Sequence, residues 1–149
     1  MSALKLVLWG FLAVLGSVAL AFVTGLVNPE EKVNGLWLVV AAACIYLLAY
    51  RFYGRWISQR VVELNDQRVT PAVRLNDGVN FHPTNKYVLF GHHFAAIAGA
   101  GPLLGPVLAA QFGFLPGFLW LVIGAVLGGA VQDFIILVAS MRRNGRSLP

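Results

Sequence analysis

The stretch that decides the fold, Gly91–Gln111, reads GHHFAAIAGAGPLLGPVLAAQ. It is long and apolar enough to cross a bilayer as a helix. However, Pro102 and Pro106 lack an amide proton, and in a helix each ring clashes with the carbonyl four residues earlier. Three glycines around them loosen the backbone further: Gly99, Gly101 and Gly105. The sequence therefore predicts a membrane-spanning segment whose helix is broken at this Gly/Pro cluster.

A broken helix inside hydrocarbon leaves backbone groups without partners. Each such group costs several kcal/mol unless protein, ordered water or an ion satisfies it. Broken helices at membrane depth usually line cavities, and transporters use them as binding sites. A packing kink buffered by neighbouring helices is the alternative. The candidate substrate- or ion-binding residues are Gly99, Ala100, Gly101, Pro102, Gly105 and Pro106.

The composition indicates an integral membrane protein. Of 149 residues, 58% are hydrophobic and 11% are charged, against roughly 45–50% and about 25% in soluble domains. The net charge of +5 does not indicate a nucleic-acid partner, because the basic residues lie between apolar runs and form no basic helix. Cys44 is the only cysteine, so no internal disulfide can form. We expect no cofactor.

Apolar runs predict an all-α, polytopic membrane protein with about four transmembrane helices. The first could instead be a signal peptide, but a signal core has only about 7–15 apolar residues, and we expect a retained helix. We treat residues 1–149 as a single membrane domain. Its predicted parts are spans 6–27, 33–50, 87–110 (broken) and 118–139, a cytoplasmic connector 51–86 and a cytoplasmic tail 140–149.

The connector is the one long polar stretch. We expect the second helix to continue past Arg51 before an irregular segment follows. Asn76-Asp77-Gly78 predicts a turn, and Pro83 followed by Thr84 predicts a helix start with Thr84 as the N-cap.

The basic residues predict the orientation of the chain. Of the 11 lysines and arginines, only Lys32 falls on the opposite side of the predicted spans from the others. By the positive-inside rule both termini should be cytoplasmic. The tryptophans fall near the ends of the spans, as in an aromatic belt. This pattern would fail if segment 87–110 entered and left the membrane on the same side.

Asp133 is the strongest single candidate for a functional residue. It lies about 13 Å inward of Arg142 at ~1.5 Å per residue, where a carboxylate costs about 2.5–3.5 kcal/mol. At helical spacing it shares a stripe with Ala125 and Gly129, and the polar neighbour Gln132 shares the adjacent stripe with two further glycines, Gly124 and Gly128. Small residues allow close helix contact. Proton or ion coupling and a structural hydrogen bond or ion pair remain equal alternatives.

His92 and His93 begin the third predicted span. Adjacent helical residues point about 100° apart, so the pair cannot chelate one ion, and we expect no metal site. A histidine at a cytoplasmic entrance suits proton relay, and ordinary hydrogen bonding at a helix start is an equal alternative. His82, beside a proline, is interpreted as a loop residue.

From Asn76 onward the sequence resembles the N-terminal domain of the carbon starvation protein (CstA) family of bacterial inner-membrane transporters. Five segments carry the resemblance: Pro83-Thr84-Asn85-Lys86, Val88–Gln111, Leu115-Pro116-Gly117, Gly129–Asp133 and Arg142–Leu148. The first two predicted spans resemble the family only in their apolar character. Phe81-His82 and Pro149 depart from the pattern.

The resemblance implies a many-helix secondary transporter for proton-coupled uptake of peptides or pyruvate under carbon starvation. This chain would be an N-terminal part of it, since members are several times longer. The implied partners are the lipid bilayer, a small anionic or peptide substrate, a proton or other coupling ion, and the rest of the transporter or other chains. Asp133 and one or both histidines would handle the proton.

Two other function classes compete with transport. A structural or assembly module would use the Gly124/Gly128 spacing only to pack helices. An intramembrane enzyme is not expected, because the chain has no HExxH zinc motif, and no serine or cysteine lies beside a base.

Overall fold

The computed structural model describes residues 3–27, 29 and 34–146. Within these residues all regular secondary structure is helical, which confirms the predicted all-α class. Predictions for Val33, for most of the turn at residues 28–32 and for Ser147–Pro149 lie outside the described residues. The chain divides into two compact units, residues 1–63 with 115–131 and residues 64–114 with 132–149.

Three described helices are long and apolar enough to cross a membrane. They run from Ala3 to Val23, from Gly35 to Val61 and from Phe114 to Arg142, with 21, 27 and 29 residues. These correspond to the first, second and fourth predicted spans and confirm a helical membrane protein. The third predicted span, 87–110, consists instead of two shorter helices.

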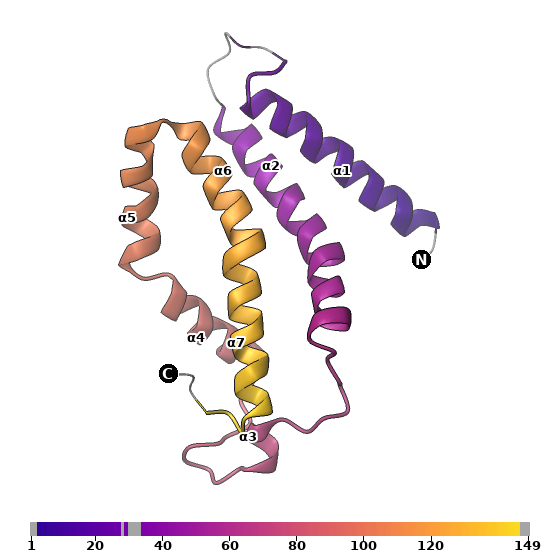
Figure 1. Ribbon diagram of the computed structural model, residues 1–149, viewed down its shortest axis with the longest axis vertical. Helices are drawn as coiled ribbons and strands as arrows, with labels where there is room; N and C mark the ends of the chain where they lie inside the picture. The colour runs from indigo at the N-terminus through magenta and orange to yellow at the C-terminus, as the bar shows by residue number, and fades with distance from the viewer. Residues whose placement is uncertain (1–2, 28, 30–33, 147–149) are drawn as a thin grey trace. The chain divides into compact units, whose positions relative to one another are not determined.

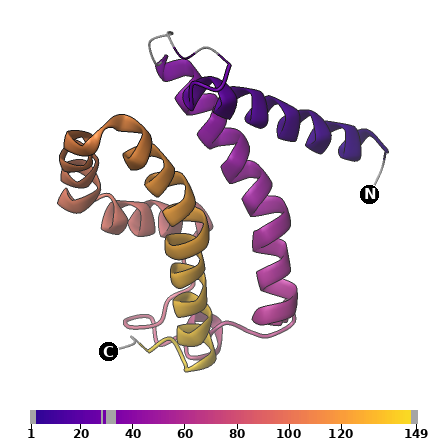
Figure 2. The ribbon, with the colours of Figure 1, turned by 45° about the horizontal axis from the view of Figure 1, so that its top comes forward.

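In the first unit, α1 (Ala3–Val23) packs antiparallel to α2 (Gly35–Leu48), as Figures 1 and 2 show. The two backbones approach closely at Gly16, where an added Cβ would lie 2.8 Å from Cys44 Cβ. Ala19, Val23 and Ala41 form the buried centre of this contact. Small residues therefore allow the two apolar helices to pack, and Cys44 is a buried packing residue.

The end of α1 differs from the predicted span 6–27. The helix begins earlier, at Ala3, and ends at Val23. Gly25 adopts a φ of +74°, and the amide of Leu26 bonds to the carbonyl of Ala21 at 3.0 Å. This is a glycine C-cap of the Schellman type. The residues after Gly25 are apolar, so hydropathy alone extended the helix too far.

The second helix begins at Gly35, where the Asn34 side chain caps it by accepting from the amide of Leu36 at 2.9 Å. It continues through two π-helical turns, Ala49–Gly54 and Ile57–Val61. The prediction that it continues past Arg51 is confirmed. The predicted boundary at residue 50 marks only where the apolar part ends.

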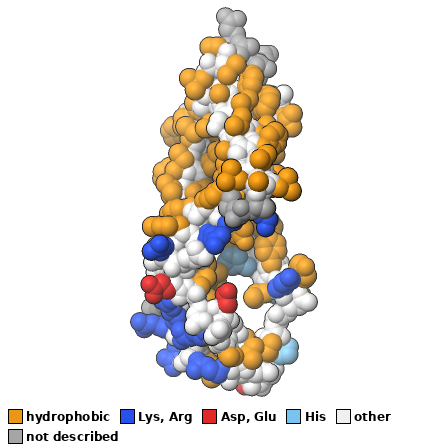
Figure 3. Space-filling model, turned by 90° about the vertical axis from the view of Figure 1, so that its right-hand side faces the viewer, with side chains coloured by type: hydrophobic (Ala, Val, Ile, Leu, Met, Phe, Trp, Pro, Cys, Tyr) orange, Lys and Arg blue, Asp and Glu red, His pale blue; other side chains and the backbone are white. Residues whose placement is uncertain are grey.

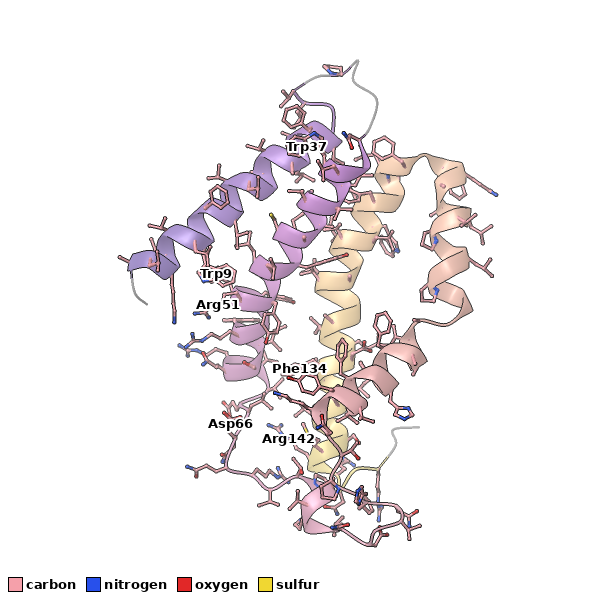
Figure 4. The ribbon with its side chains drawn as sticks, turned by 180° about the vertical axis from the view of Figure 1, so that it is seen from behind. Trp9, Trp37, Arg51, Asp66, Phe134 and Arg142 are labelled. Carbon is pink, nitrogen blue, oxygen red and sulfur yellow. The ribbon has the colours of Figure 1, made fainter. Side chains whose placement is uncertain are left out.

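Aromatic pairs mark both ends of the α1–α2 hairpin. Phe22 and Trp37 stack with ring centroids 4.8 Å apart at one end. Trp9 and Phe52 meet edge to face at 5.7 Å at the other, and Figure 4 shows Trp9 and Trp37 at these opposite ends. On the face seen in Figure 3, hydrophobic side chains form a broad area with few charged side chains among them. This segregation is expected of a surface that meets lipid.

The last long helix comprises α6 (Phe114–Gly124), a π-turn (Ala125–Gly129) and α7 (Ala130–Arg142). It begins four residues before the predicted position 118 and ends at Arg142 instead of 139. Pro116, predicted to lie in a loop, is the third helical residue. The first turn tolerates proline because its amide would have no helical partner there.

The connector contains a short helix, α3 (Pro71–Arg74), and a tight loop at Asp77 in the second unit. The Asp77 carboxylate accepts the amides of Val79, Asn80 and Phe81 at 2.8–3.0 Å. Gly78 has a φ of +71°, so the predicted turn is confirmed. The backbone hydrogen bonds from Phe81 and Val79 lower the pKa of Asp77 from 3.8 to about 2.

This pKa predicts how the loop responds to acid. Because the folded pKa lies below 3.8, the carboxylate stabilises the loop fully above that pH, and the contribution disappears as the pH falls through about 2. An NMR titration of the Asp77 carboxyl carbon should give a midpoint near the lower value. A midpoint near 4, which is ordinary for Asp, would contradict the loop geometry.

Residues of the connector contact the segment after α7 in what we call the clasp, formed by Pro71, Arg74, Phe81, Asn144 and Gly145. The Arg74 guanidinium donates to Asn144 Oδ1. Gly145 has a φ of +71°, and an added Cβ there would lie 2.9 Å from the Phe81 ring and 3.5 Å from Pro71. The connector and the end of α7 are therefore held together, 70 residues apart in sequence.

Gly145→Ala is expected to open the clasp. An L side chain at this φ costs about 1–2 kcal/mol, and the new methyl group would press on Phe81. Trypsin should then cut the connector at Arg68 or Arg74 several-fold faster. Gly91→Ala is the matched control, since a Cβ there meets nothing within 4 Å. Equal cleavage rates in both variants would argue against the clasp.

Candidate functional site

The candidate site is built on α4 (Lys86–Ile97) and α5 (Ala100–Ala109), both in the second unit. The N-cap of α4 is Asn85, whose side chain accepts from the amide of Tyr87 at 2.9 Å. The prediction of Thr84 as N-cap is wrong by one residue. The Thr84 hydroxyl donates instead to the carbonyl of His82 at 3.1 Å, so it is not available to the helix.

The predicted break is present at Ala98 and Gly99. Ala98 leaves the helical region with a ψ of 39°, and Gly99 is extended with a ψ of −165°. The helices on either side have 12 and 10 residues, or about 18 and 15 Å at ~1.5 Å per residue. Each is shorter than the hydrocarbon core of about 30 Å. Figures 1 and 2 show α4 and α5 running in different directions on either side of the break.

The two prolines have different roles. Pro102 is the third residue of α5, where it needs no amide partner. Its ring would clash with the carbonyl of Ala98 if the helix continued, and the chain avoids this clash by breaking there. Pro106 lies inside α5, so it does not end the helix. The break therefore lies at the start of the predicted region 98–106 instead of throughout it.

The break leaves helix-end groups without helical partners. The amide of Ala98 donates to the carbonyl of Phe94 at 2.9 Å, and the amide of Gly99 donates to the carbonyl of Ile97 at 2.8 Å. The first amides of α5, on Ala100 and Gly101, have no partner within α5, and the last carbonyls of α4 have none within α4, because a helix leaves these end groups unpaired. The break thus presents amides from one helix end and carbonyls from another.

The predicted ligand-binding residues Gly99, Gly101, Pro102, Gly105 and Pro106 are exposed, and α4 buries none of its residues. A Cβ at any of the three glycines would meet nothing within 4 Å. The backbone of the break therefore lies open at the surface of this chain.

His92 and His93 lie on α4 between its start and the break, and both are exposed. Neither ring makes a hydrogen bond with the residues that the structure describes. Among those residues no three histidine, cysteine or acidic side chains come together as metal ligands.

Asp133 is half-buried on α7, and Gln132 beside it is exposed. No basic side chain in the described part of the chain pairs with Asp133. Nor does the structure contain a buried polar side-chain atom without a partner among the described residues, so the carboxylate oxygens are accessible. The ion pair considered from the sequence is therefore not formed with any described arginine.

The π-turn changes the stripe on which Asp133 lies. At Ala125–Gly129 the backbone bonds to the fifth residue back, as in the bond from the amide of Ala130 to the carbonyl of Ala125. One extra residue in a turn shifts the register by one position. Asp133 therefore continues the line of Gly129 and Gly124, and the predicted stripe through Ala125 is wrong. A π-turn is frequent near functional sites, but the sequence pattern gave no signal for it.

Comparison with known proteins decides the family. The family described as "Carbon starvation protein CstA" matches residues 34–149. The chain belongs to the CstA family. The match begins well before Asn76, so the resemblance also covers the second span.

Curated members of the CstA family extend the match to nearly the whole chain. The chain is 59% identical over 144 residues to the "Peptide transporter CstA" of Escherichia coli, covering 97% of this chain and 20% of that protein. It is 59% identical over 140 residues to the "Pyruvate/proton symporter BtsT" of the same organism, covering 94% and 19%. The "Peptide transporter CstA" of Bacillus subtilis is 60% identical over 115 residues, covering 77% and 19%.

The chain therefore spans about a fifth of the length of these relatives. No solved structure matches the chain. The relatives bear the names of transporters, which favours transport over enzyme chemistry.

Proposed function

We propose that this chain forms part of a CstA-type secondary transporter for proton-coupled uptake of peptides or pyruvate during carbon starvation. The break at Ala98 and Gly99, in the same compact unit as an unpaired intramembrane carboxylate at Asp133, carries the proposal. The printed names of the relatives support the substrate class: one is a peptide transporter and another a pyruvate/proton symporter.

The proposed binding groups are backbone groups of the residues at and after the break. The first amides of α5 lie at the positive end of a helix dipole and would hold a substrate carboxylate. The carbonyls at the end of α4 would take the ammonium group of a peptide or a coupling cation. Glycines suit this role because they leave room for a ligand to approach the backbone, and a proline leaves the carbonyl four residues earlier without its helical partner. The proposed set is Gly99, Ala100, Gly101, Pro102, Gly105 and Pro106.

The proposed proton site is Asp133, with His92 and His93 as relay groups and Gln132 as a polar neighbour. A carboxylate inside a membrane is costly unless it is paired, protonated or hydrated. Since Asp133 has no partner among the described residues, alternation between the charged and the protonated form satisfies this requirement. The two histidines would pass protons because imidazole titrates near neutral pH.

We further propose a multi-pass location in the bacterial inner membrane with both termini cytoplasmic. The clasp supports it, because the contact of Arg74 with Asn144 requires the connector and the end of α7 to lie on one side. The helix Phe114–Arg142 is long enough to cross, so the segment 86–112 must cross in the opposite direction. This would make it a broken crossing and not a re-entrant loop.

The proposal is tested with a chimera. The 144 matched residues of the Escherichia coli peptide transporter are replaced by this chain, and the chimera is reconstituted in proteoliposomes. An inward proton gradient should drive saturable uptake of a labelled dipeptide or of pyruvate, and a protonophore should abolish it. A correctly inserted chimera that moves neither substrate would favour the alternative of a non-transporting assembly module.

A further inference from the structure

The side chain of Arg51 lies at the point where the second helix leaves its apolar part. Its guanidinium carbon lies 5.8 Å from the centroid of the Trp9 ring and 5.9 Å from that of Phe52. Trp9 comes from α1, and the two rings contact each other edge to face. Figure 4 shows Trp9 and Arg51 side by side. Two helices of the first unit, α1 and the helix Gly35–Val61, thus hold one cation beside aromatic rings.

The rings hold the guanidinium in place, but they do not accept hydrogen bonds from its N–H groups. A guanidinium has five N–H donors, and no oxygen of any described residue accepts a hydrogen bond from Arg51. The side chain is half-buried, so an acceptor can still reach it. That acceptor must come from outside the described residues, because none of them supplies one.

Further positive charge surrounds Arg51. Lys5 lies four residues before Trp9 on α1, and Arg55 lies four residues after Arg51. The Arg55 Nε donates to a neutral partner, Gln59 Oε1, at 3.3 Å. No carboxylate of the described residues forms an ion pair with any of the three. The acceptor that fits is therefore an anion.

Aromatic and apolar side chains indicate where this anion sits. Tyr53 and Trp56 stack beside the basic residues, with centroids 6.2 Å apart, and Trp and Tyr concentrate at the headgroup level of membranes. From this end, exposed apolar side chains continue toward the middle of both helices, including Leu8, Phe11 and Leu47. A phospholipid would use both features, whereas a free phosphate would use only the charge.

We propose that Arg51, with Lys5 and Arg55, binds the headgroup phosphate of an anionic phospholipid. Trp9 and Phe52 hold the guanidinium in place, so that it can donate two hydrogen bonds to the phosphate, as arginine commonly does. The acyl chains lie along the exposed apolar faces of α1 and α2. This site uses the first unit only and does not depend on transport.

The test is lipid retention by the chain in nanodiscs that contain equal amounts of phosphatidylglycerol and phosphatidylcholine. After transfer to detergent, native mass spectrometry counts the bound lipids. The chain should retain phosphatidylglycerol in preference to phosphatidylcholine. Arg51→Gln should weaken this retention by about tenfold, because it removes charge-assisted hydrogen bonds to phosphate. Arg68→Gln is the matched control, since Arg68 is an exposed connector arginine, and it should retain lipid as the unchanged chain does.

Two further arms make the test decisive. Arg51→Lys preserves the charge but not the planar donor geometry, and it should weaken retention by about threefold; it also guards against a failure of Arg51→Gln to insert. Excess inorganic phosphate should not displace the lipid. Equal losses in Arg51→Gln and Arg68→Gln, equal retention of the two lipids, or displacement by phosphate would each overturn the proposal.

Discussion

Replacing Asp133 with asparagine in the transport chimera is expected to reduce proton-driven uptake by at least about tenfold. The asparagine side chain does not ionise, so it cannot bind and release the coupled proton, which is a role of ionisable groups at membrane depth. Asparagine has nearly the same size, so substrate binding should change little. The measurement is uptake with and without a proton gradient, together with pyruvate or dipeptide affinity. A loss of uptake with unchanged affinity would identify Asp133 as the coupling residue.

Asp66→Asn is the matched control for Asp133. It removes one carboxylate from the exposed connector of the same compact unit, and uptake should remain at the level of the unchanged chimera. If Asp133→Asn also retained full coupling, Asp133 would instead have a structural role, and the assignment of the proton site would be wrong.

Pro102→Ala is expected to close the break between α4 and α5. Alanine restores an amide that can bond to the carbonyl of Ala98, and it is about 3 kcal/mol more favourable than proline inside a helix. The free helix-end groups would then be used within one continuous helix. Substrate affinity, measured by calorimetry on the chimera, should fall by at least about tenfold. The backbone amides and carbonyls proposed to bind the substrate would then bond to each other within the helix.

Pro116→Ala provides the comparison. It removes a proline from the first turn of α6, outside the proposed binding set, and leaves Ala98 and Gly99 unchanged, so the break should persist and affinity should be largely retained. If the two variants had the same affinity, the position of Pro102 relative to the break would have no functional meaning.

Hydropathy and proline chemistry predicted much of this fold. The apolar runs located three crossing helices, and Pro102 predicted a break because its steric effect acts on the residue four positions earlier. The exact helix ends could not be predicted in the same way. The end of α1 depends on the positive φ of Gly25, and the start of α6 depends on Pro116 fitting into its first turn. A hydropathy profile contains neither of these backbone features.

The candidate site was predicted less completely. The break was expected on the third segment, and the structure has it there, at Ala98 and Gly99; the roles of His92 and His93 stay predictions. The π-turn before Asp133 was not predicted, because glycine and alanine fit an α-turn equally well. The clasp was also missed. Its contact between Arg74 and Asn144 joins positions 70 residues apart, and a single sequence has no local signal for such a pair.

Amide hydrogen exchange at the break tests the central claim most directly. In the chimera in lipid nanodiscs, the amides of Ala100 and Gly101 should exchange rapidly without substrate, because they are the first amides of α5 and have no partner within that helix. Saturating dipeptide or pyruvate should slow their exchange by at least about tenfold. Exchange as slow as in the middle of the Gly35–Val61 helix, and unchanged by substrate, would contradict a ligand site at the break.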